Sequence, residues 1–267
     1  MTYYGKLPIV LLAELAAGRE DSNNCRIARY LLGRLDRLGE VSVEKLAAEC
    51  FVSKATVSRF CRDIGLEDFS ELRDLLRQTE RTFTLYGEGL PPREQGLCFC
   101  ERVQNSLTLA ATTIDYAALV RLSEEIRKAS RVACFGLLKA ETAAISLQSD
   151  LVMLGINAVT KVAFREQADF LGSAGPEDVV VIFSYTGIYF DYGLPREALR
   201  NRRVWLVTGC PDICERFEAK GLPTERLLTF QSEQDFVSHP YQLMLAASLI
   251  GQRVGAYMGT DQRDILR

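Results

Sequence analysis

The pattern of apolar and polar positions divides the chain into two parts with different periods. Up to about residue 82, apolar residues recur at the three- and four-residue spacing of amphipathic helices. From residue 131 onward, short apolar runs of strand length alternate with helical patterns. The first part is therefore predicted to be all α, with helices over 8–17, 24–38, 42–50, 54–64 and 69–82.

The second part is predicted to be an α/β domain built on five strands. The strands are expected at 131–136, 157–162, 178–184, 203–209 and 226–231, with helices near 140–154, 165–171, 190–200, 212–220 and 239–257. Nearly continuous apolar strands between helices are typical of a parallel sheet covered on both faces. Right-handed crossovers then predict a doubly wound, flavodoxin-like sheet.

A linker is predicted at residues 83–96, which hold three glycines and two adjacent prolines. It separates an N-terminal domain over 1–82 from a C-terminal domain over 97–267. The helical pattern returns at 97–112 and 115–128, ahead of the first strand.

The stretch from Ser42 to Gly65 predicts two short helices joined by a tight turn. Asn24 is expected to cap the helix before it and Gly39 to end that helix. Ser42 is expected to begin the first of the two helices, and Ser53 to cap the second. An apolar stripe of Val57, Phe60, Cys61 and Ile64 would face the core. The opposite face of the second helix carries small, hydroxylated and basic residues, which suit the major groove of double-stranded DNA. The candidate DNA-binding residues are Ser53, Lys54, Ala55, Thr56, Ser58, Arg59 and Arg62.

Charge supports DNA binding only through its local placement. The net charge is −3, and residues 1–82 hold 13 basic and 13 acidic residues. Further arginines could add to the local field or simply solvate a helix; they are Arg26, Arg29, Arg34 and Arg37. The chain has no run of eighteen apolar residues, so no membrane span is expected. The apolar segment 8–17 contains Glu14 and is interpreted as an amphipathic helix and not a signal sequence, which predicts a cytoplasmic protein.

The eight cysteines do not suggest a metal site. They form no Cys-x-x-Cys pair, and the only histidine is His239, so neither a metal nor a cofactor is expected. Cys50, Cys61 and Cys134 fit apolar patterns and are predicted to be core residues. Redox sensing through Cys98 and Cys100, or through Cys210 and Cys214, stays open as a minor alternative.

A ligand is expected where the strand order of the sheet reverses, beyond the carboxyl ends of the first and third strands. The two loops there are 136–141 and 184–191. Ser184 and Thr186 place two hydroxyls around a turn that ends at Gly187, and such a turn before a helix favours a phosphate. An ordinary strand-to-helix turn of Ser, Thr and Gly explains the same residues.

With these motifs in place, the chain resembles the RpiR (MurR/RpiR) family of bacterial transcription regulators over nearly its whole length. Residues 52–73 resemble the family's helix-turn-helix most specifically, and SYTG at 184–187 matches the phosphate loop of its SIS (sugar isomerase) domain. The resemblance implies a regulator of sugar metabolism genes that pairs as a homodimer or homotetramer and binds a phosphorylated sugar. The ligand-binding residues it implies are Gly136, Lys139, Ser184, Tyr185, Thr186, Gly187 and His239.

The chain departs from the family pattern at both sites. Leu138 and Ala140 stand where the first loop usually has glycine and serine, and Tyr189 replaces a threonine after the second loop. Phe51 stands where the helix-turn-helix turn usually has glycine, which predicts an ordinary backbone geometry there or strain. Lys139 could offset the losses in the first loop or be a plain surface lysine.

Three functions remain open at this point. The leading one is a regulator switched by a phosphosugar. A regulator whose SIS domain only dimerises is favoured by the altered first loop. A sugar-phosphate isomerase would need an acid and a base from Glu141, Asp191 and His239, which have no motif-level spacing. His239, with Ser238, begins the last long helix and is either a contact of the ligand or part of a helix cap.

Overall fold

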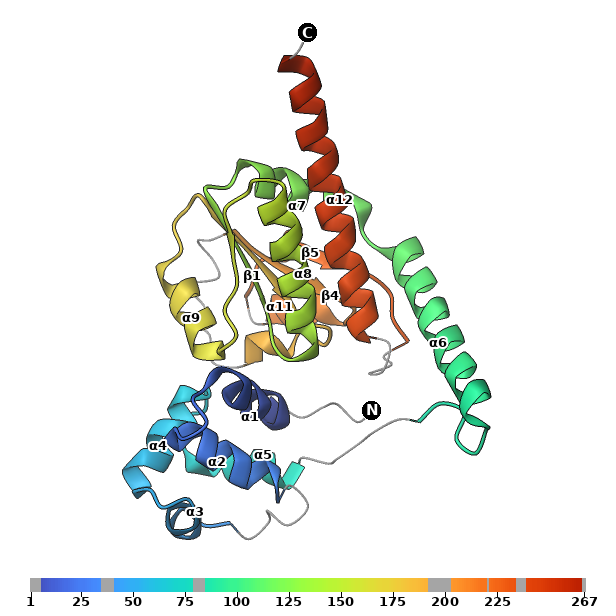
Figure 1. The fold of residues 1–267 in the computed structure, drawn as a ribbon. Coiled ribbons are helices and arrows are strands. Elements are labelled where there is room, and N and C mark those ends of the chain that lie inside the picture. Colours follow the sequence, from blue (N-terminus) through green and yellow to red (C-terminus); the bar gives the residue numbers. More distant parts are fainter. Residues whose placement is uncertain are drawn as a thin grey trace. The chain divides into compact units, whose positions relative to one another are not determined.

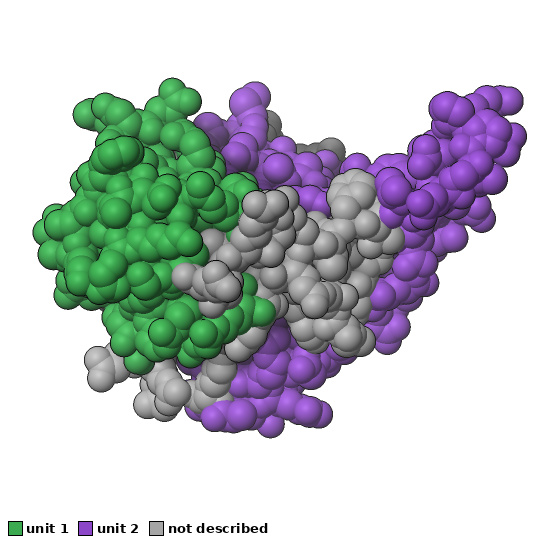
Figure 2. Space-filling view, turned by 90° about the horizontal axis from the view of Figure 1, so that it is seen from below, with its two compact units in different colours: residues 1–83, 161–170, 190–194 green, residues 84–160, 171–189, 195–267 purple. Residues whose placement is uncertain are grey.

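The computed structural model describes residues 6–34, 41–78, 85–191, 203–219, 221–233 and 239–265. The chain divides into two compact units, coloured separately in Figure 2. Unit 1 holds residues 1–83 with the short segments 161–170 and 190–194, and unit 2 holds the remaining residues. No helix among the described residues is both long and apolar enough to cross a membrane.

Unit 1 contains the predicted helices with shifted ends. They are α1 (Lys6–Ala17), α2 (Asn23–Leu32), α3 (Val43–Glu49), α4 (Lys54–Asp63) and α5 (Phe69–Gln78). The prediction for α2 was wrong at both ends. Ser22, and not Asn24, caps its start by accepting a hydrogen bond from the Cys25 amide, and the helix stops at Leu32 with Gly33 as its C-cap. Gly39 lies outside the described residues.

Asn24 contributes a tertiary contact in place of the expected cap. Its side-chain amide donates to Glu14 Oε2 on α1 at 3.2 Å and to Asp63 Oδ2 on α4 at 3.3 Å. Burial raises the pKa of Glu14, and the Asn24 hydrogen bond opposes that rise. Asn24 therefore joins three helices of unit 1 through polar contacts.

The core of unit 1 is formed by the apolar faces of its short helices. Fully buried side chains include Leu31 of α2, Leu46 of α3 and Leu72 of α5. Burial of each contributes about 1.5–3 kcal/mol, which these short helices need because they are marginal in isolation.

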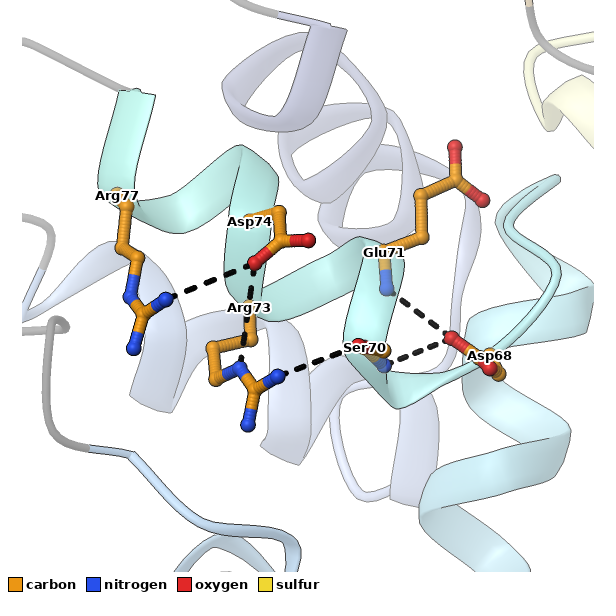
Figure 3. A network of polar contacts seen from close by, with 6 residues as sticks. All are labelled: Asp68, Ser70, Glu71, Arg73, Asp74 and Arg77. Atoms are coloured by element: carbon orange, nitrogen blue, oxygen red, sulfur yellow. Dashed lines mark hydrogen bonds and ion pairs between the residues drawn. The ribbon is translucent and has the colours of Figure 1, made fainter.

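Polar contacts stabilise helix α5 on its exposed side. At the start of α5, Asp68 accepts hydrogen bonds from the amides of Ser70 and Glu71 (Figure 3). Further along the helix, Asp74 forms ion pairs with Arg73 and Arg77.

Unit 2 begins with two helices, α6 (Pro92–Thr113) and α7 (Tyr116–Lys128). The helix predicted from residue 97 in fact starts at Pro92, so residues 92–96 are helical and not linker. Proline suits this first position because its missing N–H would have no partner in a helix.

Five parallel strands form the sheet of unit 2 in the order β2-β1-β3-β4-β5, which confirms the predicted doubly wound class (Figure 1). The strands are β1 (Arg131–Gly136), β2 (Ala158–Val159), β3 (Asp178–Phe183), β4 (Arg203–Thr208) and β5 (Leu227–Thr229). The remaining helices are α8 (Lys139–Met153), α9 (Phe164–Ser173), α11 (Ile213–Ala219) and α12 (His239–Ile265), with a 3-10 turn η2 (Ile188–Asp191). Most of the helix predicted at 190–200 lies outside the described residues.

The sheet is buried on both faces. Val132, Val181 and Val207 point into a core shared with α7, α8 and α12. The alternating residues on the opposite face, such as Phe135 and Ile182, are equally buried. Two buried faces explain why the strands read as continuous apolar runs and not as alternating patterns.

Candidate functional site

Residues 42–65 fold as two helices joined by a short turn. The hydroxyl of Ser42 caps α3 by accepting from the Lys45 amide, and Ser53 caps α4 by accepting from the Thr56 amide. The predicted cap at Ser53 is confirmed, and Ser42, which was expected to begin its helix, is the N-cap of α3. The predicted stripe of Val57, Phe60, Cys61 and Ile64 has no exposed surface.

The outer face of α4 is open to solvent, as its spacing predicted. Its exposed residues are Ser53, Lys54, Ala55, Ser58, Arg59 and Arg62, while Thr56 is half buried. The hydroxyls of Ser53 and Thr56 also lie 2.9 Å apart, so these two side chains already serve the cap. Arg59 and Arg62 are left as long cationic side chains on a surface of small residues.

Two of the basic residues around this face have partners within the domain. Lys54 Nζ forms an ion pair with Glu44 Oε1 at 2.5 Å. The hydrogen bond from Lys54 lowers the pKa of Glu44 to about 2. Arg26 donates to the carbonyl of Cys50 at 3.2 Å, at the C-terminal end of α3. Arg37 lies outside the described residues.

The turn between α3 and α4 contains a strained residue. Phe51 has φ of 53°, a left-handed conformation that glycine adopts freely and phenylalanine does not. Its side chain is 87% exposed. The strained alternative expected for this turn is therefore the one that occurs.

The two candidate ligand loops of unit 2 lie side by side. Gly136 ends β1 and pairs in register with Phe183, which ends β3. The loops that follow thus leave the same edge of the sheet at the point where the strand order reverses. This is the position predicted for a ligand.

The first loop is tightly constrained by its backbone. A Cβ on Gly136 would lie 2.6 Å from the Ala140 carbonyl oxygen, so no side chain fits there. Leu138, which stands at the usual glycine position, adopts φ of 55° and ψ of −117°. The loop therefore keeps a glycine-type conformation with a leucine in it. Lys139 is exposed and Ala140 is buried.

The second loop turns sharply at Gly187, whose φ is 69°. Ser184 is buried, and its hydroxyl accepts from the Tyr189 amide at 3.3 Å. Thr186 is half buried, and its carbonyl accepts from Arg216 Nη1 at 2.7 Å. Within the described residues, the loop continues into the four-residue turn η2 and not directly into an α-helix. Amides and hydroxyls of this loop are the groups that could hold a phosphate, and residues 192–200, where the sequence predicted a helix, lie outside the described residues.

Tyr185 points away from the loop into the interior of unit 2. Its ring centroid lies 4.7 Å from that of His239, the first residue of α12. Its hydroxyl is hydrogen-bonded to Ser232, which donates to Gln242 Oε1 at 2.9 Å. Gln242 in turn donates to the Ser106 carbonyl of α6 at 3.0 Å. Tyr185 and His239 thus support the loop from inside, and Ser238 lies outside the described residues.

With this geometry in place, comparison with protein-family models decides the nature of the first domain. Residues 18–81 match the model of the helix-turn-helix domain of the rpiR family. Residues 18–81 are an rpiR-family helix-turn-helix domain. The match covers the helices from α2 to α5, including the exposed face of α4.

A curated relative shares about two fifths of its length with the chain. It is an uncharacterized HTH-type transcriptional regulator of Caldanaerobacter subterraneus subsp. tengcongensis, 33% identical over 126 residues. The aligned part covers 43% of this chain and 42% of the relative. This similarity supports a shared part of the two proteins and does not extend to the whole of either.

Two solved structures are similar to the chain at low sequence identity. The Vibrio vulnificus NanR protein complexed with ManNAc-6P is 18% identical, covers 97% of this chain and 98% of its own, and has a TM-score of 0.46. A putative sugar-phosphate isomerase from Listeria monocytogenes is 15% identical, covers 67% and 99%, and has a TM-score of 0.49. The fold class of unit 2 rests on the strand order of this chain itself.

The second loop is held by several residues that were not predicted from the sequence. Thr208, at the end of β4, donates to the Tyr185 carbonyl at 2.9 Å. Arg216 of α11 supports the Thr186 carbonyl, and Ser232 and Gln242 support the Tyr185 hydroxyl. Only the position of Thr208 at a strand end was a signal available in the sequence.

The titratable groups of unit 2 give no metal site among the described residues. Burial raises the pKa of Glu141 on α8. Burial and the hydrogen bond to Asp212 raise the pKa of the Cys210 thiol to about 11, so this cysteine is a thiol at neutral pH. The predicted core cysteines Cys50, Cys61 and Cys134 are all buried.

Proposed function

We propose that the chain is a DNA-binding transcription regulator of sugar metabolism genes. The observation that carries this proposal is the outer face of α4 in an rpiR-family helix-turn-helix domain. Arg59 and Arg62 are exposed on this face, beside the small residues Ala55 and Ser58. A helix with such a face enters the major groove without steric conflict, and its arginines reach base edges and phosphates.

The DNA-binding role is tested by equilibrium binding of the full-length chain to a duplex from the region upstream of its own gene. Arg59→Ala is expected to weaken binding by about 5- to 150-fold, because one good arginine contact discriminates by about 1–3 kcal/mol. Arg121→Ala is the matched control, since Arg121 is exposed on α7 of unit 2. Equal binding by the Arg59→Ala variant and the wild type would refute the assignment of α4.

The proposal includes a phosphorylated sugar as effector, bound beyond β1 and β3. Support comes from the two adjacent loops at the strand-order reversal, and from Ser184 and Thr186 around the turn at Gly187. An effector changes DNA binding only if it prefers one arrangement of the regulator over another. A regulator of this kind is proposed to act as a homodimer or homotetramer, in which each further subunit contributes a DNA half-site.

Effector binding is tested by thermal unfolding of the chain with a panel of sugar phosphates. A stabilised melt that is lost in Thr186→Val would support a phosphate at this loop. Valine keeps the shape of Thr186 and its carbonyl bond to Arg216, so only the hydroxyl is removed. Thr108→Val on α6 serves as the control, because Thr108 is exposed and bonds to the carbonyl of its own helix.

A second candidate is a regulator whose sheet domain only pairs subunits. Leu138 and Ala140 favour it, because they remove a glycine and a hydroxyl from the first loop. Melts that do not respond to any sugar phosphate, together with intact DNA binding, would favour this candidate over the effector-controlled regulator.

A further inference from the structure

The described helices of this chain repeatedly end in the same hydrogen-bonded motif. In the Schellman motif, the residue after the C-cap adopts a left-handed conformation, and two amides bond back across the last turn. Helix α4 ends this way at Gly65: the Gly65 amide bonds to the Arg62 carbonyl, and the Leu66 amide bonds to the Cys61 carbonyl. Helices α8 and α11 end in the same way at Gly155 and Gly221.

Helix α3 ends in the identical motif with Phe51 in the glycine position. The Phe51 amide bonds to the Ala48 carbonyl at 3.1 Å, and the Val52 amide bonds to the Ala47 carbonyl at 2.9 Å. The φ of Phe51 is 53°, close to the 62° to 78° of the three glycines. A side chain at this position is strained, whereas glycine is not.

Packing against the described residues of the domain does not compensate the strain at Phe51. The side chain is 87% exposed, so it buries little apolar surface in the folded domain. The chain therefore places an unfavourable residue at a position where glycine serves elsewhere, and exposes a large apolar ring to water. A benefit from this ring must come from something that binds to the domain.

The place of the ring identifies its partner. In a helix-turn-helix, the first helix crosses the DNA backbone while the N-terminal end of the second enters the major groove. Phe51 lies in the turn that joins these two helices, two residues before the cap of α4. The helix that follows carries the exposed cations Arg59 and Arg62, which complement a phosphate backbone and not an apolar protein surface.

We propose that Phe51 is a DNA-contacting residue, whose ring packs on apolar nucleotide surface at the edge of the major groove. That surface is a thymine 5-methyl group or a deoxyribose, the apolar groups a phenyl ring can meet there. The inference rests on the proposed DNA-binding function and adds to it a contact that the basic face of α4 does not supply.

The test compares Phe51→Ala, Phe51→Gly and Arg59→Ala in the full-length chain, with a duplex selected from a random-sequence pool by the wild type. Phe51→Ala removes the ring and keeps the strained backbone, whereas Phe51→Gly removes both. Both variants are expected to bind this duplex about tenfold more weakly. Only Phe51→Gly is expected to raise the melting temperature, by about 2–4 °C.

A duplex with deoxyuridine in place of thymidine then distinguishes the two apolar surfaces. If the ring packs on a thymine methyl group, the wild type loses affinity for this duplex and Phe51→Ala does not. If it packs on deoxyribose, deoxyuridine changes neither, and the loss in Phe51→Ala remains. If both Phe51 variants bind DNA with wild-type affinity, the inference is overturned. This holds even if the variants differ from the wild type in oligomeric mass. Failure of the wild type to bind any duplex would instead overturn the proposed function.

Discussion

Glu44 of α3 and Lys54 of α4 form an ion pair of 2.5 Å across the turn of the helix-turn-helix domain, with both side chains about 60% exposed. Lys54 is the first basic residue of the proposed DNA-reading helix, and Glu44 already binds it. A phosphate must therefore compete with a carboxylate for Lys54. An exposed pair of this kind adds little to stability but affects what else the lysine can bind.

Removing the carboxylate should strengthen DNA binding. Glu44→Gln is expected to raise DNA affinity about threefold, because Lys54 becomes available to a phosphate and a nearby negative charge disappears. Titration of a labelled duplex at fixed ionic strength measures the effect. Glu101→Gln on α6 changes the net charge equally and should leave affinity unchanged; an equal gain in both variants would contradict a local role for the pair.

The cap of α4 should be worth a measurable share of the domain's stability. Ser53→Ala removes the acceptor for the Thr56 amide, and is expected to lower the free energy of unfolding by about 1 kcal/mol. Ser58→Ala, on the exposed side of the same helix, should be nearly neutral. Urea unfolding followed by circular dichroism compares the two variants, and similar stabilities would show that the cap is unimportant.

The first ligand loop should respond to substitution in two opposite directions. Leu138→Gly is expected to stabilise the fold by about 1 kcal/mol, because φ of 55° suits glycine. Gly136→Ala should destabilise it by about 2–3 kcal/mol, since the added Cβ meets the Ala140 carbonyl oxygen at 2.6 Å. Thermal unfolding of both variants checks the signs, and a stabilising Gly136→Ala would be incompatible with the backbone geometry.

Stability should depend on pH through Glu14. Burial raises its folded-state pKa above the ordinary value of 4.5, so protonation favours the folded state. The stabilisation is complete below pH 4.5 and is lost as pH rises through the folded pKa. Glu14→Gln, which can still accept from Asn24, should therefore raise the melting temperature at pH 7 and change it little near pH 4. The exposed Glu20→Gln should show no such difference, and a pH-independent effect at Glu14 would contradict the cause.

Thiol reactivity should separate the cysteines by burial. Burial raises the pKa of Cys61 to about 12, and that of Cys210 rises to about 11, so neither forms a thiolate readily. Cys100 and Cys214 are exposed. Mass spectrometry after brief alkylation of the native protein at pH 8 should find label on the exposed pair and not on Cys61 or Cys210. Rapid labelling of Cys210 would reopen its redox alternative.

Regular periodicity in the sequence predicted the parts of the fold that depend on it. The stripe from Val57 to Ile64 identified the buried side of α4, and the apolar runs identified the strands of the sheet, because helices and strands repeat with fixed periods. The contacts of Asn24 could not be predicted from periodicity. It and Ser22 lie in a run of residues that all favour caps, and only the folded structure shows that Asn24 reaches Glu14 and Asp63.

The candidate ligand site was predictable in position and less so in its contacts. A parallel sheet fixes where its loops emerge, so residues 136–141 and 184–191 could be paired from the strand pattern. The supports from Arg216, Ser232 and Gln242 come from distant parts of the chain. Their side chains carry no local signal of the turn that they hold.

The most direct test of the account is the DNA affinity of the full-length chain, measured with and without a sugar phosphate that stabilises it. The sugar phosphate is expected to change the wild-type affinity for the selected duplex. Arg59→Ala is expected to lose DNA binding while its melting temperature still rises with the sugar phosphate. An Arg59→Ala chain that binds DNA as the wild type does, or a wild type that binds no DNA, would contradict the proposed function.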